Sequence, residues 1–226
     1  MTTNAVVIGA GPGLGASVVR RFAREGFTVA AVARNAQTLA GLSEAKHYTA
    51  DTTDPASVAK AAAAIRKDLG AIDVLVYNAG AFQMGGVLDL SVEDFERCWC
   101  ANCEGGFLWA REFGGGMVER KAGTIILTGA TASMRGSANF AALAVGKFGL
   151  RALAQSMARE LGPKGVHVAH VVVDGQIESA RTKQANRGAD TVLSPDAIAD
   201  SYCYLHNQHP TAWTLELDLR PAIEKF

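Results

Sequence analysis

The chain has 226 residues, of which 49% are apolar and 19% are charged. This balance is typical of a globular protein with one core, and it excludes a disordered chain. Lysine plus arginine and aspartate plus glutamate number 22 each, so the formal net charge is zero. A neutral chain argues against nucleic acid or an anionic membrane as the main partner.

Two further observations concern the setting of the protein. No apolar run is long enough to span a bilayer, and residues 1–8 lack the basic region and cleavage site of a signal peptide. We therefore expect a cytoplasmic protein. Cys98, Cys100 and Cys103 lie close together, but the first two point apart on a helix and no histidine is near. We expect reduced thiols there and no metal site.

Seven strand-like apolar runs alternate with helical stretches along the chain. Their nearly continuous Val, Ile and Leu content predicts strands covered on both faces. The alternation predicts an α/β fold, a Rossmann-type doubly wound parallel sheet of about seven strands, with residues 1–226 as a single domain. The runs are Ala5–Ile8, Phe27–Ala33, Lys46–Ala50, Ile72–Tyr77, Thr124–Thr128, His167–Val173 and Trp213–Asp218.

The intervening helices carry start signals. Asp54-Pro55 and Ser194-Pro195 each place a capping side chain before a proline at the first helical position. The longest helices are expected over residues 91–121 and 137–162. The polar segment 178–194 predicts a loop, with at most a short helix, at the carboxyl edge of the sheet where a lid would lie.

The first strand leads into a glycine-rich loop and then a helix. Glycine at positions 9, 13 and 15 satisfies G-x-x-x-G-x-G, whereas G-x-G-x-x-G would require glycine where Leu14 stands. The start of the helix offers unpaired N–H groups to a pyrophosphate, and glycine lets the backbone approach it. A glycine turn without a ligand is the alternative. The residues expected to contact the coenzyme here are Gly9, Gly11, Gly13, Leu14 and Gly15.

The end of the second run bears on the choice of coenzyme. An NAD site usually has a carboxylate at this strand end for the ribose 2′-hydroxyl. Here Ala33 occupies that position and Arg34 follows it. A guanidinium suits a 2′-phosphate, so we expect NADP(H) in preference to NAD(H). The alternative is a solvated surface arginine.

Further residues lie after strand ends or on the two long helices. Together with the glycine loop, they make the chain resemble the short-chain dehydrogenase/reductase family over essentially its whole length. The resemblance implies that Lys147 binds the nicotinamide ribose and that Asn102 holds a water in a proton relay. It also implies coenzyme contacts by the residues after the strand ends. These are Asp51 and Thr52, then Asn78, Ala79 and Gly80, and Ile177 within the sequence Asp174-Gly175-x-Ile177.

The catalytic pattern of that family is broken in this chain. The family uses a tyrosine to donate or accept the proton and a serine to orient the carbonyl. The tyrosine position, four residues before Lys147, is Leu143. The serine position is Ala130, and the tyrosine position of enoyl-reductase relatives is Phe140. The residual catalytic set is therefore Lys147 and Asn102.

Other side chains were weighed as replacements. Hydroxyls of Thr131, Ser133 or Ser137 orient a carbonyl well but donate protons poorly on their own. Tyr77 is the nearest tyrosine to the expected site, with packing at a strand end as the alternative role. Lys147 itself can protonate a substrate if burial lowers its pKa, and a purely ribose-binding role is the alternative.

The remaining expectations concern metals and partners. His167 and His170 lie on one strand and point to opposite faces, so they do not converge on one ion, and we expect structural histidines. The family resemblance implies a homodimer or homotetramer formed through the two long helices.

The sequence thus predicts an NADP(H)-dependent oxidoreductase with an altered proton-donor site, acting on a small carbonyl or an activated alkene. The alternative is a catalytically inactive NADP(H)-binding sensor or regulatory protein. The substrate itself is unknown at this stage, because the polar segment 178–194 carries no pattern that identifies it.

Overall fold

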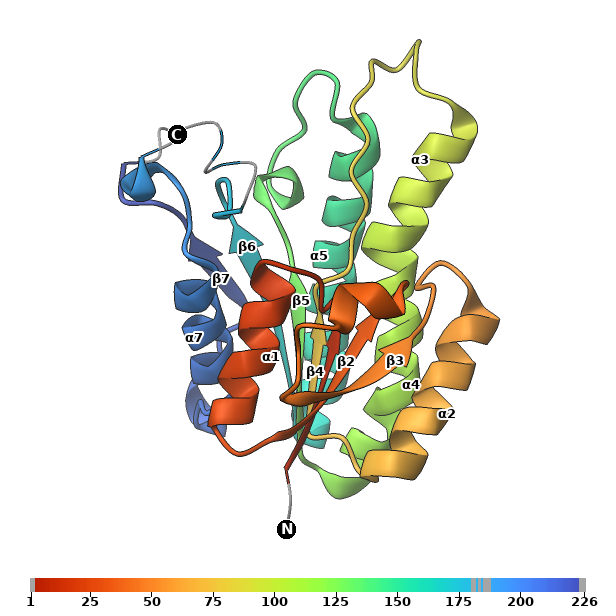
Figure 1. The fold of residues 1–226 in the computed structure, drawn as a ribbon, viewed down its shortest axis with the longest axis vertical. Helices are drawn as coiled ribbons and strands as arrows, with labels where there is room; N and C mark the ends of the chain where they lie inside the picture. Colours follow the sequence, from red (N-terminus) through yellow and green to blue (C-terminus); the bar gives the residue numbers. More distant parts are fainter. Residues whose placement is uncertain (1–2, 180–181, 183, 185–187, 224–226) are drawn as a thin grey trace.

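The computed structural model describes residues 3–179, 182, 184 and 188–223. Seven parallel strands form one sheet in the order β3-β2-β1-β4-β5-β6-β7 (Figure 1). The order reverses beside β1, which pairs with both β2 and β4. This is the doubly wound arrangement that the sequence predicts. The strands are β1 Asn4–Ile8, β2 Thr28–Ala33, β3 Ala45–Thr49, β4 Val74–Tyr77, β5 Gly123–Thr128, β6 Val166–Val173 and β7 Glu216–Leu219.

Helices cover both faces of the sheet. Helices α1 and α7 pack on one face, and α2, α4 and α5 pack on the other (Figure 1). Alternate residues of β1 therefore enter two cores, with Val7 beside Phe22 of α1 and Val6 in the core that contains Trp109 of α4. The helices are α1 Leu14–Arg24, α2 Pro55–Leu69, α3 Val92–Trp99, α4 Gly105–Arg120, α5 Ala141–Leu161 and α7 Pro195–His206.

The seventh strand begins later than the sequence predicts. The predicted run starts at Trp213, but β7 starts at Glu216. A 3-10 turn, Pro210–Ala212, precedes Trp213, and the Trp213 ring stacks on His167 with 4.9 Å between ring centroids. Trp213 therefore packs on His167 through its ring and lies outside the strand that the sequence predicts for it.

The second long helix also begins later than predicted, at Ala141 instead of residue 137. The preceding residues form a turn in which Phe140 N donates to Ser137 O at 3.1 Å and Asn139 has a left-handed φ of 66°. Asparagine tolerates this backbone region better than most residues, so the turn is accommodated at this position.

The first long helix is interrupted by a π-helical turn. Helix α3 passes through Cys100–Glu104 in π geometry before α4 begins at Gly105. The widened turn places the Ala101 carbonyl where it accepts a hydrogen bond from Tyr77 Oη at 2.6 Å. Single π-turns inside helices are frequent at functional sites, and this one contains Asn102.

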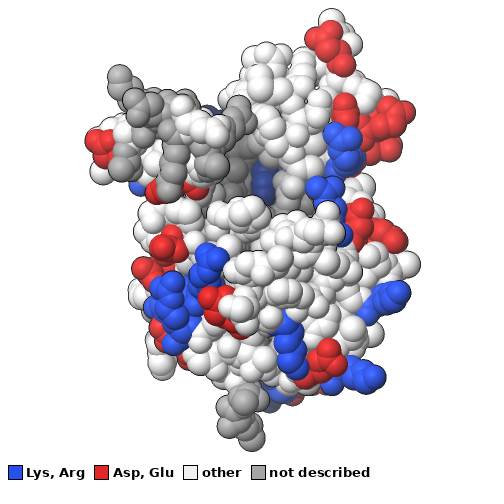
Figure 2. All heavy atoms as spheres, viewed as in Figure 1, with Lys and Arg blue, Asp and Glu red and all other residues white. Residues whose placement is uncertain are grey.

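The polar segment 178–194 is described only in part. An isolated bridge joins Ile177 to Leu193, and residues 189–191 form a 3-10 turn. Residues 180, 181, 183 and 185–187 lie outside the described residues, so the lid prediction is untested there. Among the described residues, no helix is long and apolar enough to cross a membrane. Acidic and basic side chains are interspersed on the face shown in Figure 2.

Glycines at two positions of α4 give a direct test of this packing. A methyl group at Gly105 would collide with Tyr77 Oη and Thr52 Oγ1, whereas one at Gly115 would meet no atom within 4 Å. Gly105→Ala should therefore lower the free energy of unfolding by about 1–3 kcal/mol. Gly115→Ala should raise it by about 0.5–1 kcal/mol through helix propensity. Urea denaturation measures both, and equal effects of the two changes would contradict the packing described here.

Candidate functional site

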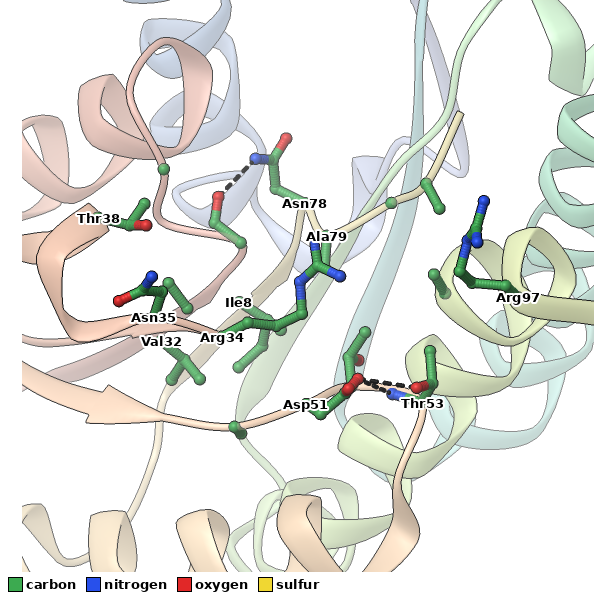
Figure 3. Close-up of a pocket in the computed structure, with 18 of the residues that line it drawn as sticks. Ile8, Val32, Arg34, Asn35, Thr38, Asp51, Thr53, Asn78, Ala79 and Arg97 are labelled. Atoms are coloured by element: carbon green, nitrogen blue, oxygen red, sulfur yellow. Dashed lines mark hydrogen bonds between the residues drawn. The ribbon is translucent and has the colours of Figure 1, made fainter. Parts of the chain in front are cut away.

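The carboxyl ends of β1 and β4 are held together at Gly9. This residue has a left-handed φ of 84°, and its N–H donates to Val32 O at 2.9 Å. Asn78 Nδ2 donates to Gly9 O at 3.0 Å, which fixes the two strand ends side by side (Figure 3). A Cβ at position 9 would lie 2.6 Å from Ala79 N, so this approach requires glycine.

A first cavity of about 740 Å³ lies along these strand ends (Figure 3). It lies at the reversal of strand order, where ligands bind in open parallel sheets. Predicted coenzyme residues come together in its lining from the glycine loop and from the ends of β2, β3 and β4. They are Gly9, Gly11, Arg34, Asp51, Thr52, Asn78, Ala79 and Gly80.

Three of the predicted loop residues do not line this cavity. Leu14 and Gly15 are buried at the start of α1, and Leu14 packs into the core. A Cβ at Gly15 would collide with Gly9 O and lie 2.8 Å from Ala10 Cα, so this glycine allows the helix to pack on the strand. Gly13 has a φ of 102°, with open space where a Cβ would be. These residues shape the loop, and their predicted coenzyme contacts remain predictions.

Asp51 is fixed and ionised at the end of β3. Its Oδ1 accepts hydrogen bonds from Thr53 N at 2.9 Å and from Thr53 Oγ1 at 2.8 Å (Figure 3). These bonds, and the nearby Arg34 guanidinium, lower the pKa of Asp51 below its usual value. Arg34 is exposed at the end of β2. One wall of the cavity thus carries a fixed carboxylate and a solvated cation.

Tyr77 is a packing residue. It is fully buried, and its Oη donates to Ala101 O at 2.6 Å, so Thr52 Oγ1 is the donor in the 3.1 Å bond that joins Thr52 to Tyr77. Thr52 Oγ1 in turn accepts from Trp109 Nε1 at 3.2 Å. Burial raises the pKa of Tyr77. Its proton is therefore held in the core, away from the cavity.

Lys147 lies behind the wall of the first cavity. Its side chain is buried, and Nζ donates to Thr128 O at 2.7 Å. Burial penalises the ammonium form and lowers the pKa of Lys147 to about 8. A pKa this close to neutrality suits a group that exchanges a proton.

Asn102 lies beside Lys147. Its Nδ2 donates to Ala81 O at 2.7 Å and to Cys98 O at 2.9 Å. Its Oδ1 is buried and, within the described part of the chain, accepts no hydrogen bond. A Cβ at Gly80 would lie 2.7 Å from this oxygen and 3.7 Å from Lys147 Nζ. The π-turn and α5 thus bring the Asn102 carbonyl oxygen and the Lys147 ammonium close to Gly80.

A second cavity of about 770 Å³ adjoins the first, since Phe82 lines both. The loop after β4 and the loop before α5 rise together beside it and are joined by a bond from Gly85 N to Asn139 O of 3.0 Å (Figure 1). Ala130, Phe140 and Leu143 all line the second cavity, as does Ile177. The positions at which the sequence predicts a missing acid and hydroxyl therefore meet here with one predicted coenzyme residue, and none of these four side chains is titratable.

Two nearby hydroxyls, those of Ser133 and Thr131, are already engaged, whereas Ser137 is exposed in the lining of the second cavity. Ser133 is fully buried, accepts from Ala130 N at 3.1 Å and does not line the second cavity. Thr131 does line it, and its Oγ1 donates to Asp174 Oδ1 at 2.5 Å. Toward the cavity, the Thr131 oxygen therefore presents only acceptor capacity.

The histidines divide into two cases. His167 bonds to Leu205 O at 3.1 Å and to Thr214 O at 2.9 Å, as expected of a structural histidine. His170 is buried on β6, and both of its ring nitrogens are without partners among the described residues. The expectation of a hydrogen-bonded structural residue is thus wrong for His170. No cluster of metal-ligating side chains occurs among the residues that the structure describes.

Some residues that line the first cavity were not predicted. Asn35 caps a 3-10 turn by accepting from Gln37 N at 3.2 Å, and this turn brings Thr38 to the rim. The Asn-x-Gln sequence carried that signal. Phe82 and Arg97 carried none, because their placement depends on how the loop after β4 and helix α3 pack. The polar and charged additions are Asn35, Thr38, Thr53 and Arg97.

A short chain dehydrogenase family model matches residues 3–190. The chain belongs to the short-chain dehydrogenase family. A short-chain dehydrogenase/reductase of Armillaria gallica is 34% identical over 175 residues, which cover 73% of this chain and 67% of that protein. D-threitol dehydrogenase of Mycolicibacterium smegmatis is 31% identical over 172 residues, 73% of this chain and 66% of that protein. The match thus spans about two thirds of these relatives.

Solved structures of the family share the whole fold. A short-chain dehydrogenase from Rhodopseudomonas palustris superposes with a TM-score of 0.84, at 36% identity, over 97% of this chain and 98% of that one. A metagenomic short-chain oxidoreductase in complex with NADP superposes with a TM-score of 0.86, at 28% identity, over 98% of each chain. These likenesses confirm the predicted fold class.

The buried lysine makes a prediction about stability and pH. Burial makes the folded state disfavour the Lys147 ammonium, and its pKa falls from the ordinary lysine value of 10.5 in the unfolded chain to about 8. Below pH 8 wild type bears this cost in full, so Lys147→Met should be more stable by roughly 2–3 kcal/mol. The unfolded chain keeps its proton up to the higher pKa, so the advantage should shrink as pH rises through that interval. Urea denaturation across pH measures the difference, and a gap that is independent of pH would contradict burial of a titrating ammonium.

Proposed function

We propose that this protein is an NADP(H)-dependent oxidoreductase of the short-chain dehydrogenase type with an altered proton-donor site. Its substrate is a small carbonyl compound or an activated alkene. The observation that carries the proposal is the position of Lys147 and Asn102, which lie together behind Gly80 in the wall of the first cavity. The cost of burying this ammonium is accounted for if a ligand uses it.

The residues present fit a pyridine dinucleotide. Gly9 and Gly80 line the first cavity at positions where a Cβ would collide with Ala79 and with Asn102, and Asn102 Oδ1 offers a buried acceptor. The NADP complex of the metagenomic relative, at full-length superposition, supports the same assignment. Such a coenzyme, when bound, supplies or accepts the hydride. The chain's own residues then bind the phosphates, hold the ribose and exclude water.

Arg34 supports NADP(H) over NAD(H). Ala33 leaves the end of β2 without the carboxylate that a ribose 2′-hydroxyl prefers, and Arg34 lines the cavity at the next position. Asp51 on the neighbouring strand end is ionised and already bonded to Thr53. A 2′-phosphate on the solvent side of Arg34 would pair with its guanidinium.

Lys147 is the proposed source of the proton. Neither Leu143 nor Phe140 can supply one, and Tyr77 and Thr131 donate their protons to acceptors within the protein. With a pKa of about 8, Lys147 is mainly protonated at pH 7 and gives up its proton more readily than an exposed lysine. Asn102 holds its orientation beside the ammonium through two backbone bonds.

The test is NADPH oxidation over a panel of ketones, quinones and activated alkenes. Wild type should turn over at least one of them, and Lys147→Ala should lower kcat by about 10²-fold or more, the usual contribution of a positioned acid. Arg24→Ala, an exposed change at the end of α1 that lines neither cavity, serves as the control. Equal kcat for wild type and Lys147→Ala would contradict the proposed proton source.

A second function, a non-enzymatic NADP(H) sensor, is favoured by one observation. Every described residue at a family acid or serine position, Ala130, Phe140 and Leu143, lacks an ionisable group. Tight NADPH binding in calorimetry, with no turnover of any panel compound, would support this function over the enzyme.

Arg34→Ala tests the coenzyme preference. It should weaken NADPH binding by about tenfold or more, as expected for loss of a charged hydrogen bond, and should leave NADH binding nearly unchanged. Calorimetric titration of both coenzymes measures the ratio. An equal loss for the two would show that the guanidinium does not contact a 2′-phosphate.

A further inference from the structure

We propose that the second cavity selects an anionic substrate, a compound with an apolar body and a carboxylate that Arg135 binds. This inference deepens the proposed function and rests on it for the reaction, although the binding it describes can be measured separately. It names the substrate class that the sequence left open.

The lining of the second cavity is the first observation. It is mostly aromatic and aliphatic, and among the described residues it contains one ionisable side chain, that of Arg135. Arg135 is exposed, so its charge lies at the solvent-facing rim of this apolar lining, where an entering anion can reach it. The apolar residues of the lining include Phe82, Met84, Phe140, Leu143, Val173 and Ile177.

The state of Arg135 is the second observation. Within the described part of the chain, its guanidinium forms no hydrogen bond or ion pair. By contrast, Arg97, Arg120 and Arg151 each pair with a carboxylate. Five N–H donors at the rim of a cavity are thus left for a ligand, and the planar fork matches a carboxylate.

The Asp174 carboxylate beside Thr131 has other partners than Arg135. Asp174, at the end of β6, accepts the hydrogen bond from Thr131 and pairs with Arg220 at 3.6 Å. Its side chain is 13% exposed. Asp174 therefore leaves the charge of Arg135 at the rim of the cavity unpaired, and an anionic ligand would pair with it.

Anchoring at Arg135 also suits the altered proton site. Ala130 and Leu143 offer nothing to orient the reacting group. Binding energy from a part of the substrate that does not react can hold the reacting group in place, which replaces some of the lost orientation. The apolar body would lie among the ring and aliphatic side chains, with Phe82 and Phe140 in contact at 5.7 Å between centroids.

The experiment compares two ligands that differ in charge, 4-phenylbutyrate and 4-phenylbutanamide. Calorimetry on wild type saturated with NADP⁺ should give about tenfold tighter binding of the carboxylate, the usual effect of a charged hydrogen bond. Arg135→Gln should abolish that preference and leave the amide affinity unchanged. Arg135→Lys should retain part of it, because the charge stays while the fork is lost.

Arg24→Gln is the matched control, since Arg24 is exposed on α1 and its substitution removes the same charge. It should keep the full preference. Equal affinity for the two ligands in wild type, no binding of either at millimolar concentration, or a preference that survives Arg135→Gln would each overturn the proposal. The titrations are repeated without coenzyme. Failure of NADP⁺ itself to bind would therefore count against the proposed function alone, and the carboxylate preference would remain a separate result.

Discussion

Burial of the Lys147 ammonium is the constraint on which the site depends. Its one hydrogen-bond partner among the described residues is the Thr128 carbonyl, at 2.7 Å, and burial lowers its pKa to about 8. A methionine of similar length would fill the same space without that cost. The chain nevertheless has a lysine at this position. The π-turn places Asn102 beside it, and glycine at positions 80 and 146 leaves room for the Asn102 side chain. Such an arrangement is expected where a ligand completes the pairing.

The first cavity is formed mainly by backbone and the second mainly by side chains. The first cavity is shaped by backbone at strand ends, by glycines and by the Asn78 bond to Gly9, so it tolerates wide change in side chains. The second cavity is shaped by side chains from the loop after β4, from the segment between β5 and α5 and from the end of β6, and it includes Leu143 and Ala130, the positions at which the sequence predicts a missing acid and hydroxyl. Side chains of the second cavity can therefore change without loss of the fold, because the reaction depends on the residues of the site and not on the fold itself.

Local pattern was enough to predict the sheet and much of the first cavity. Glycine spacing and apolar runs reflect local backbone requirements that do not depend on distant parts of the chain. Gly9, Arg34 and Asp51 accordingly line one cavity, as predicted. Features that depend on contacts between residues far apart in the sequence could not be predicted. The Thr131 bond to Asp174 joins residues 43 apart, and the π-turn depends on a tyrosine 24 residues away. The unpartnered state of His170 likewise depends on packing.

The central claim is that the coenzyme half of the site is complete and that the reaction lacks only its usual acid and hydroxyl. The most direct measurement is ketone reduction by the double variant Ala130→Ser with Leu143→Tyr, alongside NADPH affinity. The account predicts a rise in kcat of about 10²-fold over wild type with unchanged affinity, which corresponds to restoring a positioned acid. Unchanged kcat in a folded variant that still binds NADPH would show that the cavity departs from the family in more than these two side chains.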